Sequence, residues 1–320
     1  MSFEEVIGQT KIKKKLSFFL ENYNVNGIIP PLMFVGQKGD GKTFLCRAFK
    51  EKLINPETGK PKKFIEINCS TLKTVNQLVE RVIIPHMGGG TEFVTLFLDE
   101  ASELPIGITN AFLTMLNPNP NHRNNFNYNG IDITIDLRYT TFLFASSEVQ
   151  KMFISLRDRL EELHLEGYTN HQLSQIVARN LDGVDIEQEV LDDIATVLRG
   201  NARAAQKYGF KVASRIASRN KKKFTFDDWL QLRKDLEIMP LGLEETEIKI
   251  LKLLREWGAL TLTNLSCKTG LTKSALQKGM ENYLMKLGLI EIGEDGRVIT
   301  QLGINALKEV SDFKQELKRL

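Results

Sequence analysis

The chain has few of the features that mark secreted or membrane proteins. Its three cysteines, Cys46, Cys69 and Cys267, lie far apart and form no C-x-x-C pair. That number and spacing argue against a disulfide framework and offer no zinc-binding pattern. No apolar run approaches the roughly 20 residues of a membrane helix, and the polar start MSFEEVIGQ has no signal-peptide core. We therefore expect a cytoplasmic protein that does not bind membranes.

The net charge is small, with 43 Lys and Arg against 40 Asp and Glu, or +3. Over the whole chain this is a weak signal for nucleic acid. Two local basic runs, residues 11–15 and 215–223, are more prominent. Such runs are usually solvated surfaces, and contact with DNA is the other interpretation of each. The length of 320 residues suggests two or three domains.

The most informative stretch reads GQKGDGKT, from Gly36 to Thr43, and fits the phosphate-loop pattern G-x-x-x-x-G-K-[ST]. An apolar run precedes it and a helical pattern follows, which is the context that separates a phosphate loop from an ordinary Gly-rich turn. Backbone N–H groups and the helix N-terminus would face the phosphates of ATP. Lys42 would reach the β- and γ-phosphates, and Thr43 would ligate Mg²⁺. The expected nucleotide contacts are Gly36, Gly39, Asp40, Gly41, Lys42, Thr43 and Phe44.

A second motif follows about 50 residues later, where an apolar run at 95–98 ends in Asp99 and Glu100. A buried parallel strand reads as a continuous apolar stretch, and its C-terminal end lies on the ligand-binding edge of an open α/β sheet. We expect Asp99 to hold Mg²⁺ and Glu100 to act as general base toward the attacking water. An ordinary strand end would also produce this string.

Strand-like and helix-like segments alternate through residue 167, which predicts a parallel sheet with helices on both faces. The expected strands are 32–35, 64–67, 95–98 and 141–145, and helical patterns include 75–82 and 108–116. From 168 to about 239 the pattern is helical, at 170–180, 186–199, 202–218 and 226–236. A small helical domain after such a core is typically a lid over the nucleotide. Residues 240–242 read as a linker.

Residues 117–130 read NPNPNHRNNFNYNG, with seven asparagines and two prolines, and exclude a regular helix. The next seven residues alternate between apolar and polar, as in a half-exposed strand. Asn129-Gly130 is a hairpin-turn signal. We expect either a protruding β-hairpin that serves as a docking or DNA-facing element, or a flexible surface loop.

Beyond residue 243 the patterns are three helices (244–257, 263–269 and 273–287) and then two short strands around the turn at 293–296. This is a winged-helix arrangement, in which Lys273 and Lys278 would lie on the recognition helix. Residues 241–320 hold 12 Lys and Arg against 11 Asp and Glu. Such a balance is weak for a phosphate-binding surface, and winged helices also bind proteins. Both partners therefore remain open.

In their order, these motifs resemble AAA+ ATPases, and closely the RuvB family of bacterial Holliday-junction branch-migration motors, from residue 3 to about 307. The resemblance implies an AAA+ large ATPase domain at 1–167, a helical lid at 168–240 and a winged-helix domain at 241–320. Residues 5–9 resemble the family's IGQ segment, which implies that Ile7 lies at the adenine. Tyr168 matches an aromatic residue of the lid that packs near the same base.

Further matches imply roles for single residues. The ASS at 145–147 resembles the family's sensor-1 strand end, so Ser147 would be sensor 1. The LRDRL at 156–160 is similar to L-R-[SD]-R-F, which makes Arg159 the arginine finger that reaches a neighbouring subunit's ATP. The GNAR at 200–203 resembles G-T-P-R, so Arg203 would be sensor 2. Arg297 matches a wing arginine that contacts DNA. The resemblance further implies a hexameric ring on double-stranded or junction DNA, with a junction-recognition protein docking on the hairpin at 117–137. The asparagine-rich hairpin differs from that of the family, so a different partner, or none, is the alternative.

The chain also departs from the family pattern. Gln37 and Lys38 replace two prolines of the phosphate loop, and Asp40 introduces an acid, so we expect a lower nucleotide affinity. The wing turn carries Glu294 and Asp295 in place of basic residues. A loader that acts on a clamp or helicase through a protein partner is therefore the alternative to the motor. A nucleotide-dependent adaptor with little hydrolysis is a third possibility.

Overall fold

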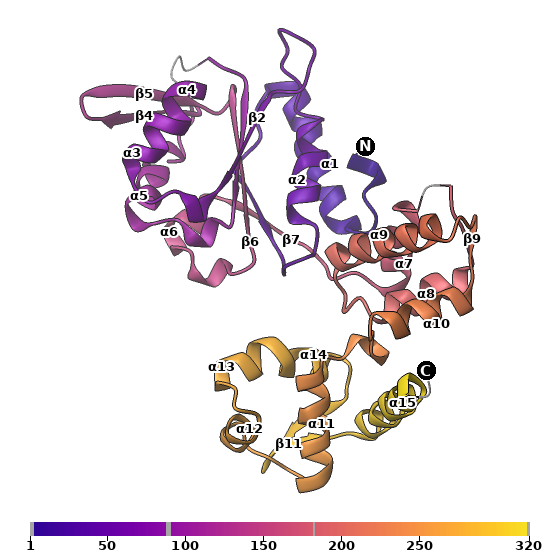
Figure 1. Ribbon diagram of the computed structural model, residues 1–320. Helices are drawn as coiled ribbons and strands as arrows, with labels where there is room; N and C mark the ends of the chain where they lie inside the picture. Colours follow the sequence, from indigo (N-terminus) through magenta and orange to yellow (C-terminus); the bar gives the residue numbers. More distant parts are fainter. Residues whose placement is uncertain (1–2, 88–90, 182, 319–320) are drawn as a thin grey trace. The chain divides into compact units, whose positions relative to one another are not determined.

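The computed structural model describes residues 3–87, 91–181 and 183–318. Its central feature is a five-stranded parallel sheet, in agreement with the alternating pattern (Figure 1). In spatial order the strands are β2 (Lys63–Asn68), β3 (Val94–Asp99), β6 (Thr140–Ser146), β1 (Leu32–Val35) and β7 (Glu161–His164). Four of them were predicted. The fifth, β7, was missed because its short sequence EELH is charged and lies at the edge of the sheet.

The strands bury alternate side chains on opposite faces, because successive residues of a strand point to opposite sides of the sheet. On one face, Met33, Leu96 and Phe142 join one hydrophobic cluster. On the other face, Phe97 and Leu143 join a second cluster. Figure 1 shows the helices that cover each face: α3 (Val75–Leu78), α4 (Ile84–Met87) and α5 (Ile106–Met115) on the first, α1 (Thr10–Asn26) and α2 (Lys42–Lys50) on the second.

The asparagine-rich segment forms a hairpin and not a flexible loop. β4 (Arg123–Tyr128) pairs with β5 (Ile131–Asp136) in antiparallel register around Asn129 and Gly130, whose φ angles of 49° and 79° suit a tight two-residue turn. The asparagine side chains bond to one another and to backbone. Asn124 Nδ2 donates to the carbonyls of Met115 and Asn117, both at 2.9 Å. This network fixes the base of the hairpin to the end of α5.

Residues 1–168 form one compact unit and residues 169–320 a second one. The predicted lid and winged helix both lie in the second unit, and the division between them stays a prediction. The lid helices are α7 (Asn170–Arg179), α8 (Gln188–Thr196), α9 (Ala202–Ser218) and α10 (Phe226–Asp235), around the fully buried Trp229. The two-residue strands β8 (Asp185–Ile186) and β9 (Lys223–Phe224), which the sequence did not predict, pair in parallel between them.

The winged-helix part follows the predicted order. It comprises α11 (Glu245–Trp257), α12 (Leu262–Thr269), the recognition helix from α13 (Lys273–Ala275) to α14 (Asn282–Lys286), and the wing strands β10 (Ile290–Gly293) and β11 (Gly296–Ile299). A final helix, α15 (Gln301–Lys318), was not predicted, and it packs on α11. The predicted linker at 240–242 is a tight turn with φ values of 56° at Leu241 and 62° at Gly242.

A buried lysine lies at the end of the sheet opposite the phosphate loop. Lys62 is 2% exposed, and its ammonium donates to the carbonyl of Arg138 at 3.3 Å and to Thr141 Oγ1 at 3.2 Å. The rings of Tyr23 and Phe93 lie 5.0 and 5.8 Å away. Burial lowers the pKa of Lys62 to about 8. Burial therefore makes the charged form of Lys62 less favourable in the folded chain than in the unfolded one.

This predicts a specific pH dependence of stability. Since the pKa of Lys62 is lower in the folded chain than in the unfolded one, the folded state loses its proton first as the pH rises above about 8. Wild-type stability should then rise relative to Lys62→Met by on the order of 2 kcal/mol between pH 8 and 10. Urea unfolding at several pH values measures this. The control is Lys60→Met at an exposed position, and parallel curves for wild type and Lys62→Met would contradict the idea.

Candidate nucleotide site and DNA-facing surface

The phosphate loop lies between the end of β1 and the start of α2, at the carboxyl edge of the sheet. Gly39 and Gly41 have φ angles of 95° and 89°, which L side chains rarely adopt. A Cβ on Gly41 would also lie 2.8 Å from the hydroxyl of Tyr168. Glycine is thus required at position 41 for two independent reasons. Tyr168, which was predicted to lie near the base, does lie against the loop.

Asp40 holds the loop together from inside. Its Oδ2 accepts a hydrogen bond of 2.6 Å from the backbone N–H of Gln37, and the residue is 8% exposed. This hydrogen bond restricts the backbone of the loop, as the two prolines do in the phosphate-loop pattern of the family. The acid is therefore part of the loop's own structure, and the expected loss of nucleotide affinity stays a prediction.

The lysine and the threonine of the pattern both make contacts that join parts of the candidate site. The Lys42 ammonium is 8% exposed and donates to the carbonyls of Gly36 and Gln37 at 2.8 and 2.9 Å. Thr43 Oγ1 donates to Asp99 Oδ2 at 3.0 Å, across 56 residues of sequence. A hydroxyl and a carboxylate held this way are suitable oxygen ligands for Mg²⁺. Phe44, the next residue, is partly exposed at 37%.

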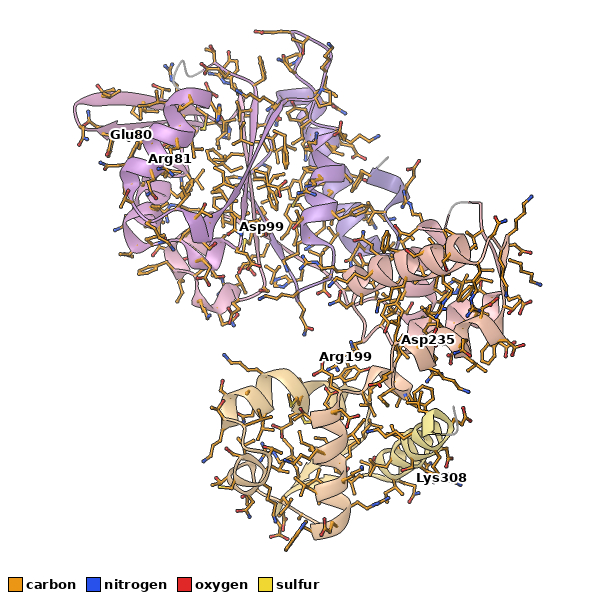
Figure 2. The ribbon with its side chains drawn as sticks, in the orientation of Figure 1. Glu80, Arg81, Asp99, Arg199, Asp235 and Lys308 are labelled. Carbon is orange, nitrogen blue, oxygen red and sulfur yellow. The ribbon has the colours of Figure 1, made fainter. Side chains whose placement is uncertain are left out.

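The two acidic residues where β3 ends, Asp99 and Glu100, differ in their backbone position and their contacts. Asp99 ends β3 at the carboxyl edge, as Figure 2 shows, and its Oδ1 accepts from the backbone N–H of Glu100 at 3.0 Å. Glu100 has φ 54° and ψ 47°, a left-handed conformation that costs a non-glycine residue about 1 kcal/mol. Backbone strain of this kind is often found at functional sites. No ion pair holds its carboxylate within the described part of the chain, which suits a general base.

The end of β6 is tied to the loop after β3 by a serine pair that the sequence did not indicate. Ser146 is fully buried, and its Oγ donates to Ser102 Oγ at 2.9 Å and accepts from the N–H of Glu148 at 3.0 Å. The predicted sensor, Ser147, is the next residue and is half-buried. Its backbone position is therefore fixed by the neighbour's hydroxyl, although its own contact with nucleotide stays a prediction.

The predicted adenine segment is hydrogen-bonded to the chain just after β7, the last strand of the sheet. Gln9 exchanges two hydrogen bonds with the backbone of Glu166, Nε2 to the carbonyl at 2.7 Å and the N–H to Oε1 at 3.0 Å. Ile7 lies just before this clamp and is half-buried. Burial raises the pKa of Tyr168, two residues after Glu166, above its usual value. Gln9 thus holds the segment at 5–9 in position. In the sequence, only the resemblance of this segment to IGQ could have indicated that role.

The two arginines near residue 158 differ in their partners. Arg157 pairs with Glu162 at 2.8 Å. Arg159 donates from Nη1 to the carbonyl of Ser155 at 2.6 Å and from Nη2 to Asn117 Oδ1 at 3.4 Å. Its Nε is buried without a hydrogen-bond partner, and no carboxylate of the described residues pairs with it. Arg159 is therefore the arginine whose charge is available to a group outside the chain.

The remaining predicted site residues lie in the second unit. Arg203 is exposed in the first turn of α9, whose start is capped by Asn201 Oδ1 accepting from the N–H of Ala204 at 3.1 Å. Because it lies outside the unit that holds the phosphate loop, its role as sensor 2 stays a prediction.

The wing arginine has an intramolecular partner. Arg297 pairs with Glu281 of the recognition helix, and its side chain is only 14% exposed. Lys273 and Lys278 on the same helix are exposed. The sequence placed all three on a DNA-facing surface. The two lysines are exposed, whereas Arg297 is paired with a carboxylate, a contact that the sequence could not indicate.

Comparison with known proteins agrees with this geometry. Residues 240–308 match the RuvB C-terminal winged helix domain family. The chain is 26% identical to the Holliday junction branch migration complex subunit RuvB of Thermotoga maritima, over 96% of this chain and 91% of that protein. The structure of the Thermotoga maritima RuvB Holliday junction branch migration motor matches with a TM-score of 0.74, at 24% identity over 96% and 97% of the two chains. Along nearly its whole length, the chain is therefore similar to the RuvB AAA+ ATPases. The expected fold class is confirmed.

A wider likeness exists in the fold alone. The Aeropyrum pernix ORC2 protein matches with a TM-score of 0.58 at 14% identity, over 97% of this chain and 94% of that one. The fold of this chain is thus shared by more than one kind of protein.

The site geometry predicts different defects for two substitutions. Lys42→Ala should abolish ATP binding, because it removes the positive charge inside the loop. Glu100→Gln should keep binding and reduce hydrolysis by on the order of 10³-fold, the middle of the usual range for a general base. Nucleotide titration and phosphate release measure the two effects. Glu103→Gln, at an exposed position on the same loop, is the control. Wild-type turnover in Glu100→Gln would show that another group activates the water.

Proposed function

We propose that the chain is an ATP-driven ring motor on double-stranded DNA that moves Holliday junctions in recombination and repair. The observation that carries the proposal is the co-linear match to RuvB, from the phosphate loop to a winged helix of the RuvB family. A motor requires an ATPase core and a domain of a DNA-binding type, and this chain has the patterns of both. Among the described residues, no helix is long and apolar enough to cross a membrane. We propose the cytoplasm as the location because the proposed activity acts on DNA in recombination and repair.

In the proposed reaction, Thr43 and Asp99 hold Mg²⁺, which neutralises charge on the phosphates of ATP when bound. Lys42 binds the β- and γ-phosphates inside the loop. Glu100 takes a proton from the attacking water. Ser147 orients that water, and Ile7 and Tyr168 contact the adenine. Arg203 contacts the nucleotide from the lid.

A homo-oligomeric ring, of six subunits as in the family, would bring Arg159 to the ATP of a neighbour. Its guanidinium lacks a carboxylate partner among the described residues, as shown above. Beside it, the α6 segment (Ile154–Arg157) and the preceding residue expose two large apolar side chains, Phe153 at 51% and Ile154 at 72%. Apolar exposure next to an available cation suits a subunit interface.

For DNA, we propose that Lys273 and Lys278 contact the phosphate backbone. The predicted contact through Arg297 would first require this residue to leave Glu281, so we assign Arg297 to holding the wing against the recognition helix. A motor must pass along any sequence, so phosphate contacts suit it better than base contacts. A junction-recognition protein would dock on the hairpin formed by β4 and β5, whose Ile131 is 51% exposed beside the turn.

The alternative is a loader that acts through a protein partner, and one observation favours it. The wing turn exposes Glu294 and Asp295, while Arg297 is held in the fold. Electron microscopy with ATP and junction DNA decides between the two functions. Rings threaded by duplex, together with DNA-stimulated ATPase, are expected for the motor. ATPase that responds only to a protein would establish the loader.

The proposed finger leads to a mixing experiment. Arg159→Ala should keep ATP binding and lose turnover by on the order of 10³-fold, because the finger stabilises charge in the transition state. Mixed with Lys42→Ala, it should recover activity at interfaces that pair an intact site with an intact finger. Arg157→Ala, which loses only the pair with Glu162, should be milder. Co-assembled mixtures without any recovery would exclude an action between subunits.

The assignment of DNA contacts predicts distinct salt dependences. Lys278→Ala should weaken binding equally on unrelated duplexes and lower the slope of log affinity against log salt by ~1, the loss of one phosphate contact. Arg297→Ala should leave the slope unchanged, since its charge is balanced by Glu281. The control is Lys308→Ala, because Lys308 lies on α15 and not on the recognition helix or the wing (Figure 2). A slope that falls for Arg297→Ala and not for Lys278→Ala would reverse the assignment.

A further inference from the structure

The turn between the lid helices and the winged helix is built around one buried ion pair. Glu247 of α11 is fully buried. Its carboxylate accepts from the guanidinium of Arg199 at 2.6 Å (Nη2 to Oε1) and 2.9 Å (Nη1 to Oε2). Oε2 also accepts from the N–H of Glu244 at 2.9 Å, which closes the start of α11. A buried carboxylate is stable only with its partner, so the two side chains have to stay together.

Tyr283 of the recognition helix completes this arrangement. The guanidinium carbon of Arg199 lies 3.9 Å from the centre of its ring, and its hydroxyl donates to the carbonyl of Leu241 at 2.6 Å. The backbone is equally constrained, because a Cβ on Gly242 would lie 2.4 Å from the carbonyl oxygen of Val197. The turn at 240–242 is therefore fixed by contacts from both sides.

Arg199 also borders the proposed sensor. It precedes the GNAR segment, and α9, which carries Arg203 in its first turn, begins three residues later. Lys286, at the end of the recognition helix, lies close to the same segment, with its ammonium 3.0 Å from the position of a Cβ on Gly200. Figure 2 shows Arg199 at this turn, above the winged helix. One fixed element thus joins the start of α9 to both α11 and α14.

We propose that Arg199 and Glu247 are positioning residues that make the lid and the winged helix move as one body, so that a response of Arg203 to nucleotide reaches the recognition helix. The transmission rests on the proposed motor function. The rigid connection itself does not, and it can be measured without DNA.

The native cysteines allow a direct measurement of the connection. Cys267 on α12 is exposed, whereas Cys46 and Cys69 are buried. Ser218→Cys at the exposed end of α9 provides the second label site. Spin-labelled protein diluted into unlabelled protein should give one narrow distance distribution, with and without a non-hydrolysable ATP analogue. Glu247→Gln keeps the side-chain shape and removes the charge, and it should broaden the distribution roughly twofold, since a half-satisfied pair no longer fixes one geometry.

The matched control is Glu245→Gln, on the same helix, whose pair with Lys314 is largely exposed. It should leave the distribution unchanged. Because Arg199→Met leaves a buried carboxylate and is at risk of misfolding, the second variant is Arg199→Met with Glu247→Met, which removes both charges. It should fold and broaden the distribution as well. Distributions as narrow as wild type in both variants would overturn the rigid connection.

Transmission is tested on junction DNA by the number of ATP molecules hydrolysed for each unit of junction movement. In Glu247→Gln, affinity for the ATP analogue and for duplex should stay within about twofold of wild type, and the ATP consumed per step should rise roughly tenfold. An unchanged ratio would overturn the transmission. If wild-type protein does not move junctions at all, the motor function fails, and the distance measurement still decides whether the connection is rigid.

Discussion

The hydrogen bond between Thr43 Oγ1 and Asp99 Oδ2 is the contact on which the candidate site depends. It joins the helix after the phosphate loop to the end of β3, although β6 lies between β1 and β3 in the sheet. The bond forms because parallel strands place their carboxyl ends on one edge. Ser146 ends β6 on the same edge, and its backbone carbonyl accepts from the N–H of Gly36 at 3.3 Å. A change in strand order would separate all of these groups at once. Every chemical role proposed for them therefore depends on the sheet topology.

Buried charged side chains usually pair with an opposite charge, and the residues here that do not are informative. Asp228 pairs with Lys221 and Arg219, and Glu247 pairs with Arg199. Lys62 instead has neutral oxygens and aromatic rings as its neighbours, which accounts for its lowered pKa of about 8. Arg159 also departs from the rule, with a buried Nε that has no acceptor in the described chain. The first exception predicts a stability that depends on pH, and the second leaves a guanidinium with no carboxylate partner among the described residues.

Much of this arrangement could be read from the sequence, because strong local patterns carried it. The phosphate loop, the strand that ends at Asp99 and α9 were predicted at or near their observed bounds. The Asn129-Gly130 hairpin was one of two interpretations that the sequence left open. The sequence did not predict the charged edge strand β7 or the helix α15, since neither contains a turn or motif signal that marks its position. Pairings between side chains that are distant in the sequence could not be predicted either. The Ser146–Ser102 bond, the Gln9–Glu166 clamp and the Arg297–Glu281 pair depend on tertiary contacts that no spacing rule encodes.

The electrostatics of the winged helix fit a ring better than a single subunit. One copy of this region has a net charge of +1, two exposed lysines on the recognition helix, and an acidic wing turn. One such surface binds phosphates weakly, since each contact adds little at physiological salt. In the proposed ring, several copies are linked, so that their contacts act together and the whole assembly binds far more tightly than one copy. Weak individual contacts also break easily. A subunit can then release the backbone and bind again further along, while its neighbours keep the ring on the duplex.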